Sequence, residues 1–224
     1  MPKDKTASHV RVMAAARDEF MEFGFEKASM RRVGERCGLT AAGLYRHCRD
    51  KEALFDQLVA PAIERLQSWM DTHLTKYLTS VQNEGNLKWQ DSWIDMMREV
   101  VYPHVDDYHL LLTCSSGTKY ESFLHDLTQT AQERMLQYLP VLRDKGLTIR
   151  EISPAALHLL LSAYVTALFE PVIHRYSLEE SMKCLETIEA FFLPGWKTLF
   201  GFLVSQEQTR RVCDAKRANA KITR

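Results

Sequence analysis

The sequence of 224 residues lacks several features that define particular classes of protein. Its five cysteines are odd in number and form no C-x-x-C pair, which argues against a disulfide framework or a zinc site. Small buried side chains are the expected role, with a redox-sensing thiol as the alternative. No apolar stretch opens the chain or approaches the roughly 20 residues of a membrane span. We therefore expect no membrane partner and a cytoplasmic location.

An excess of one charge is also missing, since 29 Lys and Arg balance 29 Asp and Glu. The distribution is uneven, however. Residues 61–203 carry a net charge of −6, whereas residues 1–60 carry +2 and residues 204–224 carry +4. Basic ends around an acidic middle are a modest indication that the ends meet a polyanion.

Alternating strand patterns are absent, and apolar residues recur at helical spacing, which predicts an all-α fold. Ser29, Thr40 and Asp50 are candidate helix caps, and glycine and proline mark the expected breaks. The expected helices cover residues 6–23, 30–37, 40–47, 51–77, 88–101, 104–114, 120–143, 155–172 and 178–192. We further expect a kink at Pro61, a loop over 79–86, a break at Pro194-Gly195 and a flexible tail from about Ser205.

The second and third of these helices have the spacing of a helix-turn-helix. Gly38 permits the chain to reverse with a positive φ, and the hydroxyl of Thr40 can cap the next helix. Leu44 then faces the core beside Val33. A short helix of this kind fits the major groove of DNA, where its exposed side chains read base edges. The residues left outward are Gly43, Tyr45, Arg46 and His47.

Cations are concentrated around the same motif. Between residues 29 and 51 the only acids are Glu35 and Asp50. The six basic residues are Arg31, Arg32, Arg36, Arg46, Arg49 and Lys51. They supply the positive footprint that binding to the phosphate backbone requires, although Arg32 and Arg36 could equally be solvated side chains.

Residues 12–55 resemble the DNA-binding domain of the TetR family of transcriptional regulators. The resemblance lies in Phe20, Gly24-Phe25, Ser29, Val33, Gly38-Leu39-Thr40, Leu44-Tyr45, Lys51-Glu52 and Leu54-Phe55. It implies a three-helix DNA-binding domain over residues 1–60. A long fourth helix joins this domain to a helical effector-binding and dimerisation domain over 61–204, and a basic tail follows over 205–224. Family members are usually dimeric repressors that release DNA when a small molecule binds.

Carried over position by position, the resemblance implies roles for individual side chains. Phosphate contacts fall to Ser29, Thr40, Tyr45 and Lys51, and base contacts to Arg31, Ala41, Ala42, Gly43 and Arg46. His47 reads a base edge or faces water or a phosphate. Two residues depart from the family pattern, because Cys48 replaces a usual phenylalanine and Gly34 a usual alanine. Both substitutions suggest loose packing in the DNA-binding domain.

The segment 155–172 is apolar nearly all round, so it must be buried on more than one side. We expect one side to face the domain core and another to face a second subunit, together with the helix that follows. The expected interface residues are Leu157, Leu161, Leu168, Met182, Leu185 and Ile188. A homodimer places two reading helices on a palindromic operator.

Aromatic and thioether side chains in the middle helices suit either a hydrophobic effector site or an ordinary core. The candidate ligand residues are Trp93, Met97, Tyr120, Phe123, Tyr164 and Phe169. No metal, cofactor or enzyme motif is recognisable, and the histidines and acids over residues 104–109 are read as a solvated turn. The sequence therefore predicts a repressor that a small hydrophobic or amphipathic effector releases from DNA. The alternative is a constitutive or architectural DNA-binding protein.

Overall fold

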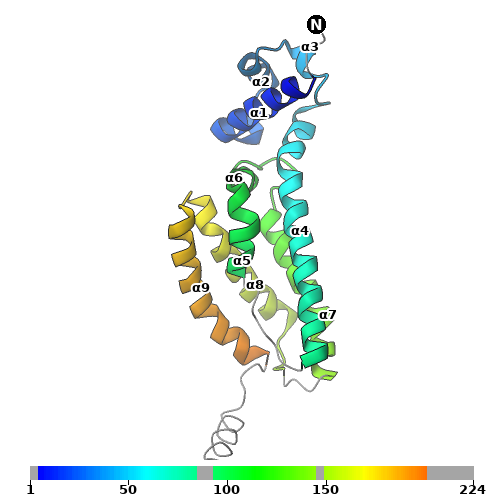
Figure 1. Cartoon of the computed structure of the whole chain (residues 1–224), viewed down its shortest axis with the longest axis vertical. Helices are drawn as coiled ribbons and strands as arrows, with labels where there is room; N and C mark the ends of the chain where they lie inside the picture. Colours follow the sequence, from blue (N-terminus) through cyan, green and yellow to red (C-terminus); the bar gives the residue numbers. More distant parts are fainter. Residues whose placement is uncertain (1–4, 85–92, 145–148, 201–224) are drawn as a thin grey trace, which may run out of the picture.

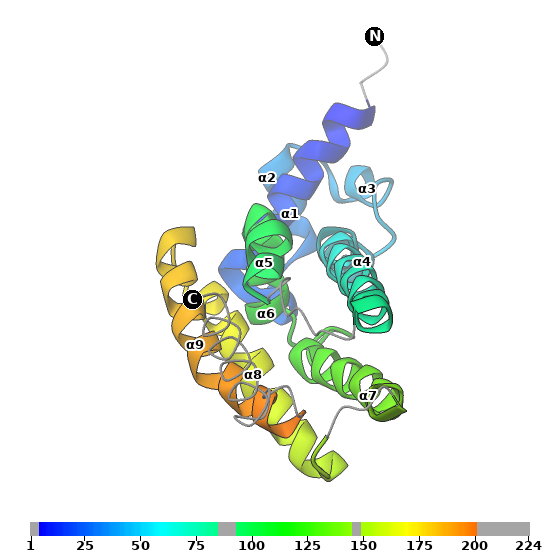
Figure 2. The same cartoon turned by 60° about the horizontal axis from the view of Figure 1, so that its bottom comes forward.

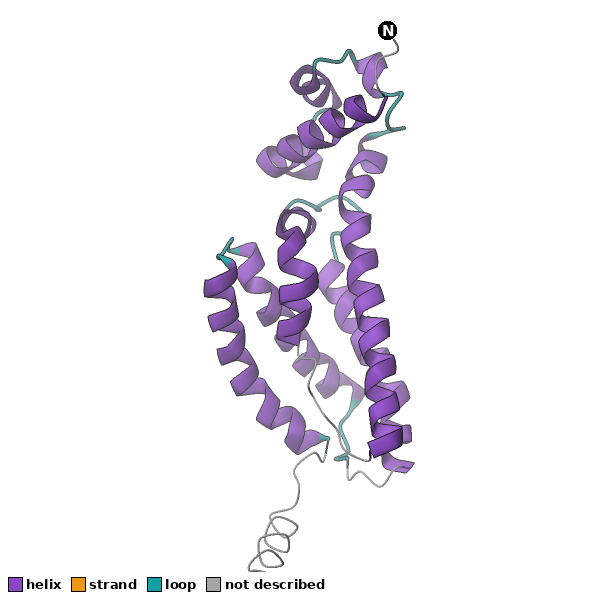
Figure 3. Cartoon of the chain, in the orientation of Figure 1, coloured by secondary structure: helices purple, strands orange, loops and turns teal. Residues whose placement is uncertain are grey.

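The computed structural model describes residues 5–84, 93–144 and 149–200, and all regular elements in these ranges are helical (Figure 3). This confirms the predicted all-α fold. The helices are α1 (Lys5–Lys27), α2 (Met30–Cys37), α3 (Ala41–Leu44), α4 (Lys51–Glu84), α5 (Trp93–Met96), α6 (Val105–Thr113), α7 (Phe123–Asp144), α8 (Pro154–Ile173) and α9 (Leu178–Leu199). The predicted tail and the start of the helix expected at 88–101 lie outside the described residues.

The three N-terminal helices form a small head at one end of the molecule (Figure 1). Helix α4 leaves this head and runs along the larger helical bundle, in which α6 lies nearest the head (Figure 1). In the second view α8 lies between α7 and α9, with α9 on an outer edge (Figure 2). The predicted arrangement, in which a long fourth helix joins a three-helix domain to a larger helical domain, is confirmed.

The head is held together by an aromatic cluster where α1 changes direction. Gly24 has φ 71° and ψ 167°, so the regular part of α1 ends at Phe23, as predicted. The turn brings the Phe25 ring 5.9 Å from the Phe20 ring and 5.4 Å from the Phe55 ring, between centroids. Because Phe55 belongs to α4, this cluster anchors the long helix in the head.

Two long helices continue past positions at which the sequence predicted breaks. Helix α4 extends to Glu84, so the loop expected from residue 79 is wrong over its described part. Pro61 lies inside α4, which is drawn as one continuous, nearly straight helix rather than a kinked one (Figure 1). Helix α9 likewise passes through Pro194 and Gly195. A proline has no N–H to donate, but once a helix is nucleated the backbone bonds of the residues on either side can continue it past a single proline.

The segment between α4 and α6 is less regular than predicted. Helix α5 passes into a π-helical turn, η1 (Met97–Val101), and a short 3₁₀ turn, η2 (Tyr102–His104), before α6. Met97, Val100 and Val101 are buried in the core. The wider π turn thus occurs where the chain packs against its neighbours rather than at the surface.

Helix α8 is long and apolar enough to cross a membrane by length and composition, contrary to the sequence-based expectation. The central helix of a soluble protein passes the same test. Leu157, Leu161 and Leu168 of α8 are all buried inside the chain, as is Leu185 of α9. These four residues therefore cannot form the contact surface that we predicted for a second subunit. Met182 and Ile188 are only partly buried.

Candidate nucleic-acid interface

The turn between α2 and α3 has the backbone geometry that the sequence predicted. Gly38 has φ 69° and ψ 30° and ends α2 through bonds from its N–H to the carbonyl oxygens of Glu35 and Gly34. The hydroxyl of Thr40 accepts a hydrogen bond of 3.1 Å from the N–H of Gly43. This capping bond starts α3 in the predicted register.

The reading helix itself is shorter than predicted, because α3 ends at Leu44 and residues 45–47 form turns. The N–H groups of Arg46 and His47 bond to carbonyl oxygens only three residues back, at 3.3 Å and 2.8 Å. Such tight bonds are typical of a helix that is ending. Leu44 and Cys48 are buried in the head, so the turn is fixed from beneath.

Of the four residues predicted to face outward, Tyr45 and Arg46 are exposed, whereas Gly43 and His47 are half-buried. Tyr45 is 52% exposed, and Thr40, Ala42 and Arg46 are also exposed. On α2, the side chain of Arg31 is 82% exposed and lies 3.6 Å from Glu35. A phenol, a guanidinium and a hydroxyl on one short segment can reach base edges and phosphate oxygens.

His47 is held from the first helix. One ring nitrogen lies 3.2 Å from the hydroxyl of Ser8, and the rings of His47 and His9 are 6.2 Å apart. The start of α1 therefore contacts the end of the reading turn. His47 is a partly buried contact between elements as well as a candidate contact to DNA.

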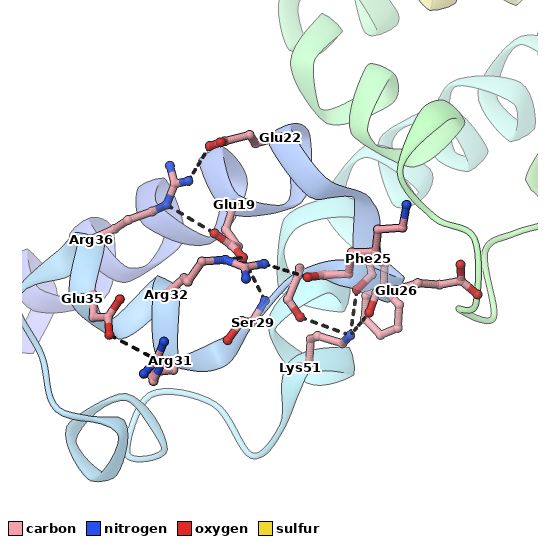
Figure 4. Close-up of polar contacts among 12 residues, drawn as sticks. Glu19, Glu22, Phe25, Glu26, Ser29, Arg31, Arg32, Glu35, Arg36 and Lys51 are labelled. Carbon is pink, nitrogen blue, oxygen red and sulfur yellow. Dashed lines mark hydrogen bonds and ion pairs between the residues drawn. The ribbon is translucent and has the colours of Figure 1, made fainter.

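The side chain of Ser29 does not make the predicted capping bond. The residue occupies the cap position of α2 with extended backbone. Its N–H instead donates to Oε1 of Glu19 over 2.8 Å (Figure 4). The start of α2 is thus fixed by a carboxylate of α1.

Lys51, for which we predicted a phosphate contact, makes contacts within the protein. Its Nζ donates to the carbonyl oxygens of Phe25, Glu26 and Ala28, at 2.7, 3.1 and 3.4 Å (Figure 4). It also lies 4.4 Å from the centroid of the Phe25 ring. Lysine offers three donors, and all three are aimed at the turn between α1 and α2.

The positive footprint is consequently smaller than the count of six cations suggests. Arg32 and Arg36 pair with Glu19, Arg49 with Asp50 and Arg31 with Glu35. Among the residues that the structure describes, Arg46 is the one cation of this set for which no ion pair or side-chain hydrogen bond occurs. Arg46 and the highly exposed Arg31 are therefore the cations best placed to reach DNA.

Asp50 starts α4 directly after the reading turn. Its carboxylate accepts hydrogen bonds of 2.7 Å from the N–H of Ala53 and from Nε of Arg49. The Ala53 bond, followed by the Arg49 bond, holds the pKa of Asp50 below its usual value. The predicted cap is confirmed by this geometry.

The head is joined to the bundle by polar contacts that the sequence did not predict. Asp107 of α6 pairs with Arg17 of α1 at 2.6 Å and with Arg65 of α4 at 3.1 Å. The N–H of Phe25 donates to the carbonyl oxygen of Cys114 over 2.9 Å. These contacts connect the turn beside the reading helices to α6 and to the loop that follows it.

Tyr120, a candidate ligand residue, belongs to this junction rather than to the bundle interior. Its hydroxyl donates to the carboxylate of Asp56, which also pairs with Lys119 at 2.6 Å. The Lys119 ammonium, followed by the Tyr120 hydroxyl, lowers the pKa of Asp56. The Tyr120 ring lies 6.4 Å from the Phe55 ring, so it extends the aromatic cluster of the head.

The other candidate ligand residues pack among themselves. Phe169 and Met97 are fully buried, and Phe123 meets Phe169 edge to face at 6.3 Å. The centroid of the Tyr164 ring lies 6.0 Å from that of Trp93, 4.9 Å from that of Phe192 and 6.0 Å from that of Trp196. Its burial, and to a lesser degree Glu189, raises the pKa of its phenol. No group of metal-binding side chains occurs among the described residues.

Comparison with known proteins agrees with the geometry of the head. Residues 12–58 match the family described as bacterial regulatory proteins, tetR family. The HTH-type transcriptional repressor Rv1474c of Mycobacterium tuberculosis is 37% identical over 70 residues, which are 30% of this chain and 37% of the relative. The HTH-type transcriptional regulator UidR of Escherichia coli K12 is 34% identical over 65 residues, 29% of this chain and 33% of the relative. The matches thus span about a third of each curated relative.

A crystal structure of a TetR-family regulator from Mesorhizobium loti aligns with 84% of this chain and 96% of its own length, at 16% identity and a TM-score of 0.46. The helix-turn-helix and the match of residues 12–58 define the class of this protein, which carries a helix-turn-helix DNA-binding domain. Through residues 12–58 the chain is similar to the TetR family.

Proposed function

We propose that this protein is a cytoplasmic transcriptional repressor that binds a palindromic operator as a homodimer and leaves it when a small apolar or amphipathic effector binds. The observation that carries the proposal is that Tyr45 and Arg46 are exposed in the turn that follows α3, the helix that the Thr40 hydroxyl caps. The family match and the name of the mycobacterial relative, a repressor, support the same reading.

In this proposal the head recognises the DNA sequence with few side chains. Arg46 and Arg31 contact base edges, because a guanidinium can form two hydrogen bonds to guanine. Tyr45, Thr40 and Ser29 hold phosphates, and the small residues at 41–43 let the backbone approach the groove. A surface this small leaves part of the specificity to thymine methyl groups and to DNA shape.

The dimer would form through the outer faces of α8 and α9. Leu159 of α8 and Phe191 of α9 are 69% and 78% exposed, and Leu160 and Leu178 are also exposed. Exposed apolar side chains on adjacent helices suit a self-complementary contact with a second copy. A two-fold axis there would give a symmetric pair of heads for two inverted half-sites.

Release of DNA requires that effector binding in the bundle changes the position of the head. Asp107 of α6 can couple the two parts, since it forms ion pairs with Arg17 of α1 and Arg65 of α4. An effector that shifts α6 would disturb both pairs. The aromatic group around Tyr164 is the apolar region from which we expect such a shift to start.

The test measures binding of the purified protein to duplex DNA by fluorescence anisotropy. Wild type should prefer duplexes that it selects from a random pool, and Arg46→Ala should reduce this preference with little change in folding. A uniform loss of affinity would make Arg46 a phosphate contact, and a wild type that binds no duplex would refute the proposal. If no apolar compound in a screen lowers the affinity, effector release is refuted in favour of constitutive binding.

A further inference from the structure

Glu19 is an unusual residue in the head because its carboxylate is buried completely, with an exposed fraction of 0%. It lies on the inner face of α1 next to Phe20, among residues that form the apolar core. A buried carboxylate is costly unless donors surround it. Two groups of the α2 region donate to its Oε1, namely the N–H of Ser29 at 2.8 Å and Nε of Arg32 at 2.6 Å (Figure 4). Nε of Arg36 forms an ion pair with Oε2 at 3.3 Å, and no hydrogen bond reaches Oε2 among the described residues.

Both arginines are held by further contacts on the same side. Arg32 donates to the carbonyl oxygen of Lys27 over 2.7 Å, and its guanidinium lies 4.3 Å from the centroid of the Phe23 ring. Arg36 donates to the carboxylate of Glu22. Figure 4 shows the two guanidinium groups directed toward α1, away from Arg31.

A buried ion-pair cluster seldom stabilises a protein more than apolar side chains of the same size would. Here the cluster fixes the position of α2 against α1 and holds the charged groups of Arg32 and Arg36 beside Glu19. Glu19 sets the start of α2, which carries Ser29 and Arg31, and it keeps two of the six cations of the motif from the DNA-facing side.

We propose that Glu19 is a positioning residue that sets the sequence specificity of DNA binding by withholding Arg32 and Arg36 from the phosphate backbone. This inference rests on the proposed DNA-binding function. Phosphate contacts raise affinity for all sequences alike, so two fewer of them lower non-specific binding relative to operator binding.

The experiment compares the salt dependence of binding to a random-sequence duplex for wild type, Glu19→Gln, Arg36→Gln and the triple variant E19Q/R32Q/R36Q. Glutamine keeps the size of Glu19 but removes its charge. Arg36 keeps its bond to Glu22 in this variant, so the slope of log affinity against log salt should steepen by about 0.9 if Arg32 alone reaches a phosphate and by about 1.8 if both arginines do. The preference for selected over random duplexes should fall, and the triple variant should return to the wild-type slope.

Other outcomes overturn the inference. A Glu19→Gln variant that binds both duplexes more weakly at the wild-type slope would reduce Glu19 to a purely structural role. Arg36→Gln provides a second test that removes the ion pair but leaves Glu19 both of its hydrogen-bond donors, Ser29 and Arg32. Its slope should equal that of wild type, and a slope shallower by about 0.9 would show that Arg36 already contacts a phosphate. A wild type that binds no duplex overturns this inference together with the proposed function, whereas the preceding results overturn it alone.

Discussion

The ammonium group of Lys51 lies 2.7 Å from the carbonyl oxygen of Phe25 and closes the turn between α1 and α2 from the first residue of α4. A residue that sequence similarity assigns to a DNA phosphate thus makes its described contacts within the protein. The relationship ties the long helix to the base of the helix-turn-helix.

Lys51→Met should therefore lower stability rather than remove a phosphate contact. Losing charge-assisted hydrogen bonds to the turn should reduce the free energy of unfolding by about 1–2 kcal/mol in a denaturant titration. The salt dependence of DNA binding should keep its slope, and Lys27→Met, an exposed lysine nearby, should leave stability unchanged. A slope shallower by about 0.9 would restore the phosphate role.

Tyr45→Phe should weaken DNA binding without lowering the stability of the fold. The phenol is half exposed at the reading turn, and no hydrogen bond to its hydroxyl occurs among the described residues. Removing it should leave the melting temperature unchanged but weaken binding to all duplexes about fivefold, the worth of one hydrogen bond of about 1 kcal/mol. Equal affinity for wild type and variant would mean that Tyr45 does not touch DNA.

Asp107→Asn should loosen the head from the bundle. Asp107 bridges two arginines on different helices, and solvent screening limits the pairs to a combined contribution of about 1 kcal/mol. Hydrogen exchange in α1 should become faster while α8 stays protected. Asp106→Asn, which changes the exposed neighbour on the same helix, is the matched control. Unchanged exchange in α1 would show that the bridge does not couple the two parts.

Phe191→Glu should prevent dimerisation. The ring is the most exposed of the large apolar side chains described, and a charge there would be desolvated at the proposed interface. Light scattering should give the mass of one chain for this variant and of two for wild type. Val141→Glu, an exposed position on α7, should remain a dimer. A dimeric Phe191→Glu variant would move the interface elsewhere.

Glu189→Gln should stabilise the protein at neutral pH. Burial, and secondarily the nearby Asp95 carboxylate, raises the pKa of Glu189. Because its pKa is higher in the folded state, the stability it contributes is present at low pH and is lost as pH rises through the folded value. The melting temperature of the variant should exceed that of wild type at pH 7, and the two should converge below about pH 4. A lower melting temperature at pH 7 would contradict the raised pKa.

Much of the head could be predicted because its signals are local. Gly38 and Thr40 specify a turn through their own backbone and hydroxyl, and both act as predicted. The internal contacts of Lys51 and the burial of Glu19 were missed because their partners lie elsewhere in the sequence. One signal could have revealed Glu19. It falls on the helical stripe of Val12, Ala16 and Phe20, where a carboxylate implies buried donors.

The bundle was harder to predict for a similar reason. Helix α8 is apolar nearly all round, so its periodicity cannot distinguish the face toward its own core from the face toward a partner. The stripe of Leu157, Leu161 and Leu168 proved to face the core, and Leu159 is exposed instead. The length of α9 could not be predicted from single residues, because Pro194 lies inside this helix rather than at its end.

Selection of duplexes from a random DNA pool by the full-length wild type, followed by sequencing of the bound fraction, is the most direct measurement. We expect an enriched motif of two inverted half-sites whose centres lie about one helical turn, or a multiple of it, apart. Arg46→Ala should relax the motif at the same position in both halves. A bound pool with no enrichment over the input would contradict sequence-specific reading by this helix-turn-helix.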